Sequence, residues 1–212
     1  MQPRASILRR VACLAAVCAL TAVGADAASA ATKKPVKKPA PPVCNLVKKA
    51  PSGLSDQSMD ITSADVATNA TTLTTVIRVV KLTTTDTSSP EGRQWEFDFK
   101  VDGSSLDVLA VTNGPFGTTT TYNYGTATLD PTKNEIRYSI SLADFAKATG
   151  TSLIKNGKSV FTSFAASSST VMQSPSTALG HTLATLGQGD TAQSAPTAKY
   201  TAGQPSCVKV GS

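Results

Sequence analysis

Three aspartates early in the chain, Asp56, Asp60 and Asp65, have side chains that could bind a metal ion. Ca²⁺ prefers oxygen ligands and takes about six to eight of them, so clustered carboxylates are its usual partners. The spacing here is irregular and unlike that of an EF-hand loop. Surface turns and strand ends explain the same residues without a metal. The sequence therefore offers calcium as a hypothesis, and no cofactor is the simpler expectation.

Aromatic residues suggest a second kind of chemistry, the stacking of sugar rings. Tyr122 and Tyr124 fall in phase with each other and follow a glycine-rich turn that contains Phe116. Aromatic rings have apolar faces that suit the faces of pyranose rings. Trp95 is in phase with the apolar positions of the alternating segment 94–101, which predicts a core residue rather than a ligand contact.

Residues for catalysis are sparse. The chain has one histidine, His181, and contains no Gly-x-Ser-x-Gly, His-Glu-x-x-His or Cys-x-x-Cys motif. Ser152 and Lys155 match Ser-x-x-Lys, but the companion motifs of that serine chemistry are missing. We expect no enzymatic activity. A hydrolase built on two carboxylates that face each other in a cleft is the less favoured alternative.

Two cysteines, Cys44 and Cys207, bracket the segment that can fold. A disulfide between them predicts an oxidising location outside the cytoplasm. In the entropic model, a disulfide that closes so long a loop lowers the entropy of the unfolded chain and thereby stabilises the folded state by roughly 5 kcal/mol. Two free thiols, or pairing with another protein, are the alternatives.

Residues 1–30 have the features of a secretory signal peptide. Three arginines precede an apolar run, 11–23, and a small-x-small pattern ends at Ala30. The run is shorter than the ~20 residues that span a bilayer, although an uncleaved anchor is the alternative. We expect a secreted protein, extracellular or associated with the cell envelope, without a membrane span after cleavage.

The net charge of +6 belongs to the N-terminal part of the chain. Residues 31–42 form a linker rich in proline and lysine, which favours an extended spacer. Residues 43–212 carry 13 basic and 13 acidic side chains, so the predicted domain is neutral. This balance argues against nucleic-acid binding. The linker serves either as a tether attracted to anionic wall polymer or lipid headgroups, or as a solvated spacer.

The predicted domain consists mainly of strands. Residues 94–101 and 104–111 alternate around Asp102-Gly103, a pair typical of a two-residue hairpin turn. Further strands are predicted at 59–66, 71–82, 118–129, 135–141 and 159–165. A short helix is predicted from Ser141, its N-cap, to Gly150. Residues 166–205 are predicted mostly as loop, with a strand near 179–186.

These elements predict an all-β protein: an antiparallel, jelly-roll-like β-sandwich with one short helix, its ends joined by the disulfide.

One resemblance rests on the order CNLV, MDITSADV, LTTVIRVVKL and WEFDFKVDG between Cys44 and Leu142. It is similar to secreted bacterial β-sandwich modules of the DOMON and family-nine carbohydrate-binding kinds. The resemblance implies a binding module found alone or beside extracellular peptidases. Members of the wider group often hold calcium in an acidic N-terminal loop. This chain departs from that pattern at Lys48 and Lys49.

The sequence thus favours a non-catalytic binding or interaction module, with carbohydrate or wall polymer as the first ligand class. The alternative is a structural domain, or one that binds an unidentified protein, with no small ligand. Tyr122, Tyr124 and Phe116 are the predicted ligand contacts.

Overall fold

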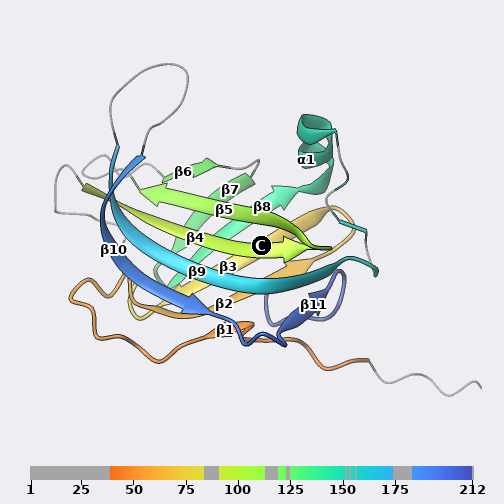
Figure 1. Cartoon of the computed structure of the whole chain (residues 1–212), viewed down its shortest axis with the longest axis horizontal. Helices are drawn as coiled ribbons and strands as arrows, with labels where there is room; N and C mark the ends of the chain where they lie inside the picture. The colour runs from red at the N-terminus through yellow and green to blue at the C-terminus, as the bar shows by residue number, and fades with distance from the viewer. Residues whose placement is uncertain are drawn as a thin grey trace, which may run out of the picture. The chain divides into compact units, whose positions relative to one another are not determined.

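Eleven β-strands and one helix make up the computed structural model within the residues that it describes (Figure 1). Those residues are 39–83, 91–112, 119–122, 125–150, 152, 154–155, 157–173 and 183–211. The elements are β1 (Val47–Lys48), β2 (Ile61–Thr68), β3 (Thr72–Val79), β4 (Glu91–Val101), β5 (Ser104–Thr112), β6 (Thr119–Tyr122), β7 (Gly125–Asp130), β8 (Glu135–Ser141), α1 (Leu142–Thr149), β9 (Val160–Gln173), β10 (Leu183–Gln193) and β11 (Lys199–Thr201).

The strands form two antiparallel sheets. Sheet I has the order β1-β2-β3-β8-β7, and sheet II has the order β10-β9-β4-β5-β6 with β11 also paired to β9. Figure 1 shows the strands of sheet II crossing in front of those of sheet I. One hydrophobic cluster contains residues of both sheets, including Ile77 of β3 and Phe97 of β4. The β-sandwich predicted from the sequence is confirmed.

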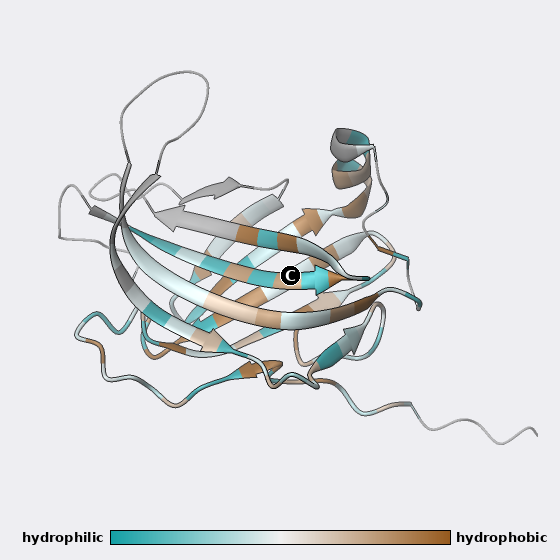
Figure 2. Ribbon diagram, in the orientation of Figure 1, coloured by the Kyte–Doolittle hydropathy of each residue, from teal (hydrophilic) through white to brown (hydrophobic). Residues whose placement is uncertain are grey.

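Alternation along β4 sends one set of side chains into this core. Trp95, Phe97 and Phe99 are at most 2% exposed, while the residues between them face outward. Figure 2 shows alternating bands of hydrophobic and hydrophilic residues along β4. Trp95 Nε1 donates to Ser58 O, and Tyr138 Oη of β8 donates to Trp95 O, so the buried polar atoms connect the two sheets. The prediction that Trp95 is a core residue is confirmed.

The hairpin between β4 and β5 turns at the predicted dipeptide. Asp102 and Gly103 have φ angles of 49° and 89°, both in the left-handed region that a type I′ turn requires. The Asp102 carboxylate accepts a hydrogen bond from Val160 N at 2.9 Å, which ties the turn to β9 and lowers the pKa of Asp102. The register of the hairpin is therefore fixed at its tip.

Helix α1 begins and ends as predicted. Ser141 Oγ accepts from Asp144 N at the N-terminus, and Gly150, with φ 71°, forms a left-handed C-cap. Phe145 packs into the core and holds the helix on the sandwich.

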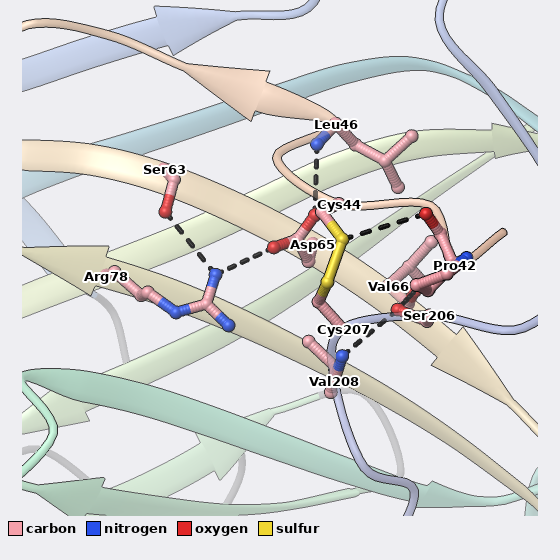
Figure 3. The surroundings of a disulfide bond; sticks show 10 residues. All are labelled: Pro42, Cys44, Leu46, Ser63, Asp65, Val66, Arg78, Ser206, Cys207 and Val208. Atoms are coloured by element: carbon pink, nitrogen blue, oxygen red, sulfur yellow. Dashed lines mark hydrogen bonds and ion pairs between the residues drawn. A yellow bond between two sulfur atoms is a disulfide. The ribbon is translucent and has the colours of Figure 1, made fainter.

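A disulfide between Cys44 and Cys207 joins the two ends of the domain, with Cα atoms 5.2 Å apart (Figure 3). Residues 206–211, which include Cys207 and are here called the C-terminal strap, lie on the outer face of sheet I. Val208 packs against Ala67 and Val76 of β2 and β3. The predicted disulfide is present.

Within residues 166–205 the predicted strand near 179–186 overlaps β10, but the prediction that the rest is loop was wrong for most of the described residues. Most of the described part of this region is strand: β9 continues to Gln173, and β10 and β11 follow. β9 pairs with β4 on one side and with β10 and β11 on the other. Ladder hydrogen bonds on both edges outweigh the low strand propensity of serine, and the buried Ser168 hydroxyl adds a bond to Met59 O at 2.6 Å. The two-residue β1 was also not predicted.

Candidate functional site

Three carboxylates share the outer face of sheet II, and we call this group the acidic face: Glu96 and Asp98 of β4 and Asp107 of β5. Phe97 and Phe99 point into the core, so the alternating Glu96 and Asp98 point out. The hairpin register places Asp98 directly opposite Asp107. Cβ atoms of such a pair lie about 4.5–5.5 Å apart.

Partial burial and neighbouring negative charges make two of these carboxylates, Glu96 and Asp98, reluctant to ionise. The pKa of Asp98 is raised, first by partial burial and then by the negative charge of Asp107. The pKa of Glu96 is raised by partial burial and then by the charges of Asp98 and Asp107. Either a proton or a hydrogen-bond donor from a ligand would relieve this repulsion.

A shallow pocket of about 220 Å³ lies beside the acidic pair. Lys100, Ser105 and Ser163 line it together with the two aspartates. Ser163 has a φ of 55° and lies where the register between β4 and β9 shifts after Asp98, so a β-bulge shapes the pocket. Carboxylate acceptors, hydroxyls and an ammonium donor together suit a ligand rich in hydroxyl groups.

The outer face of sheet I has a different character. Arg78 donates to Asp65 Oδ2 at 2.7 Å and to Glu135 Oε1 at 2.9 Å. Arg137 pairs with Glu135 and also donates to Lys209 O of the C-terminal strap at 2.8 Å. The charges on this face thus neutralise one another and hold the strap.

The three aspartates predicted as calcium ligands lie near one another in sequence, but each carboxylate contacts other donors. Asp60 accepts from the backbone N–H groups of residues 52, 53 and 54, at 2.7–3.3 Å. Asp65 accepts from Leu46 N at 3.0 Å as well as from Arg78. Asp56 accepts from Arg93 Nε at 2.6 Å and from Ser58 N at 3.0 Å.

Among the described residues, no group of three or more acidic, histidine or cysteine side chains is arranged to hold a metal ion. These contacts do not fit a calcium cage, because protein donors already occupy the carboxylate oxygens. The calcium hypothesis stays a prediction without support from this geometry.

The predicted aromatic contacts lie mostly outside the described residues. Phe116 and Tyr124 are outside them, and so is His181. The backbone of Tyr122 belongs to β6 and pairs with Leu109, whose partner on β4 is Glu96. The register position of Tyr122 is thus two strands from that of Glu96.

The sequence prediction missed the acidic face, although a signal for it was present. A two-residue turn at 102–103 pairs residues whose numbers sum to 205, and this relation alone places Asp98 opposite Asp107. The pocket beside them is shaped by the bulge in β9, which no local pattern predicted.

Comparison with models of known protein families and with curated proteins finds no match to this chain. In the part of the chain that the structure describes, no helix has the length and apolar character needed to cross a membrane.

Proposed function

We propose that this protein is a secreted, non-catalytic binding module for carbohydrate or wall polymer, extracellular or at the cell envelope. The observation that carries the proposal is the acidic face: three half-buried or exposed carboxylates on one outward sheet surface, beside a pocket lined by hydroxyls and Lys100. The disulfide, the signal-like N-terminus and the resemblance of residues 44–142 to carbohydrate-binding sandwiches support it.

The chemistry of the acidic face favours hydroxyl donors. An ionised carboxylate only accepts hydrogen bonds, and each sugar hydroxyl has a proton to donate. Hydrogen bonds to charged groups contribute about 1.5–3 kcal/mol each, more than neutral ones. Asp98 and Asp107 offer neighbouring acceptors that adjacent hydroxyls on one ring can reach together.

The same arrangement supports binding over hydrolysis. Glycosidases use two carboxyl groups that flank the scissile bond from different sides. Asp98 and Asp107 are neighbours on a single sheet face. The alternative of a structural or protein-binding domain without a small ligand has no comparable feature among the described residues.

The test is a pull-down of the purified protein on insoluble peptidoglycan, chitin and cellulose at low and high salt. The wild type is compared with a variant that carries Asp98→Asn and Asp107→Asn. A matched control carries Asp130→Asn and Asp144→Asn, which lie away from sheet II and remove the same charge.

We expect the wild type and the control to bind at least one polymer at high salt, and the acidic-face variant to lose at least tenfold in affinity. Equal binding by all three proteins would contradict the assignment of the face. Absence of binding to every polymer would contradict the proposed ligand class and favour a protein partner.

A further inference from the structure

A second hollow lies beside β1 and β11, and we call it the basic groove. It has a volume of about 470 Å³ and runs between the segment 43–48 and the segment 193–199. Lys48 of β1 and Lys199 of β11 both line it. In Figure 1 these two strands and the end of β10 lie along the lower side of the domain.

The two lysines carry charges that the described residues do not neutralise. Both side chains are exposed, and neither Nζ atom has an ion-pair or hydrogen-bond partner within the described part of the chain. The neighbouring Lys49 differs, because its Nζ pairs with the buried Asp190 of β10. Two adjacent lysines thus have different roles: Lys49 forms an ion pair within the fold, and Lys48 faces the groove.

The backbone of β1 adds a neutral donor. Antiparallel pairing turns alternate residues toward the neighbouring strand, and Lys49 N donates to Thr62 O of β2. The N–H and C=O groups of Lys48 therefore point away from β2, along an edge that pairs with no other strand in the described structure. An N–H group and an ammonium group of one residue are available to the same ligand.

The walls of the groove are held in place. Cys44 is joined to Cys207, and Val43 exchanges backbone hydrogen bonds with Pro205 and Cys207, at 2.9 and 3.2 Å. Leu46 is buried in the core and its N–H donates to Asp65. A ligand would therefore meet a formed site and would not have to order it.

We propose that the basic groove binds phosphate groups of an anionic envelope polymer. The cationic side chains are both lysines, whose compact ammonium groups bind phosphate as point charges. This site goes beyond the acidic face, because it uses other residues and would bind a ligand of the opposite charge.

The test measures binding of short-chain polyphosphate by calorimetry at low ionic strength, with the full protein and all linker lysines retained. The groove variant carries Lys48→Gln and Lys199→Gln. The control carries Lys81→Gln and Lys147→Gln, two exposed lysines outside the groove with the same total charge. Urea unfolding confirms that all proteins are folded.

We expect the groove variant to lose about tenfold in affinity, the control to stay within about twofold, and the Asp98→Asn, Asp107→Asn variant to bind as tightly as the wild type or more tightly. Equal losses in the groove and control variants would overturn the proposal, since binding would then follow net charge. A wild-type protein that does not bind polyphosphate would also overturn the proposal.

Two further probes test the ligand class. Polygalacturonate, a carboxylate polymer, should bind more weakly than polyphosphate and respond less to the groove variant. A single-stranded oligonucleotide should not bind more tightly than polyphosphate. The opposite result with either probe would overturn the assignment to phosphate groups of an envelope polymer.

Discussion

The outer faces of the two sheets differ in whether their charged side chains are paired with opposite charges. On sheet I, Asp65, Arg78, Glu135 and Arg137 pair with one another, and the C-terminal strap lies over the apolar positions beside them. On sheet II, the acidic face sets like charges next to one another, and no strap covers them among the described residues. The same alternating strands can therefore make a closed face that stabilises the fold, or an acidic face whose proposed ligand binding comes at some cost in stability.

The largest expected effect is on the closed face. Replacing Cys44 and Cys207 together by serine frees the strap and should lower the free energy of unfolding by about 3–5 kcal/mol. Urea unfolding measures this change. A loss below about 1 kcal/mol would show that the strap is held by its noncovalent contacts alone.

The next effect concerns the ion network under the strap. Asp65→Asn should lower the free energy of unfolding by about 2–3 kcal/mol, because it weakens the bond to Leu46 N and leaves the Arg78 charge partly unpaired. The value lies below that for a fully buried pair because the Arg78 side chain is 25% exposed. Arg78 still pairs with Glu135 in this variant. A variant as stable as the wild type would mean that this one ion pair is enough to compensate the Arg78 charge.

A smaller effect of opposite sign is expected on the acidic face. Asp98→Asn removes one of two like charges that face each other across the hairpin, and should raise the free energy of unfolding at neutral pH by about 0.2–1 kcal/mol. The same urea titration measures it. A destabilised variant would indicate that the Asp98 carboxylate has a structural partner.

The pH dependence of stability sharpens the same comparison. Because the pKa values of Glu96 and Asp98 are raised in the folded protein, the folded state holds their protons more tightly than the unfolded chain does. Their contribution to stability therefore falls as the pH rises from about 4, where free carboxyls titrate, through the raised pKa values. Urea unfolding between pH 4 and 8 should show a smaller fall for Glu96→Gln with Asp98→Asn than for the wild type.

Much of the sandwich was predictable because its signals are local. Asp102-Gly103 fixes a hairpin, Ser141 and Gly150 cap a helix, and Cys44 and Cys207 are the only cysteines outside the predicted signal peptide. The turn and the helix caps depend on a few neighbouring residues, and the disulfide follows from the number of cysteines.

The serine-rich half of β9 was not predictable in this way. Its strand conformation comes from ladders to β4 and β10, partners that are distant in sequence. The acidic face was predictable only in part. The hairpin register places Asp98 opposite Asp107, and this follows from the local turn signal. The pocket beside them depends on the bulge at Ser163, which no local signal predicts.

The most direct test of the account compares one variant from each face in both binding and stability. The Asp98→Asn, Asp107→Asn variant and the Asp65→Asn variant are each measured for retention on the polymer that the wild type binds and for urea unfolding. We predict that the first loses at least tenfold in binding with undiminished stability, and that the second loses about 2–3 kcal/mol of stability but still binds while folded. The reverse pattern, with binding lost on sheet I and kept on sheet II, would contradict the assignment of the two faces.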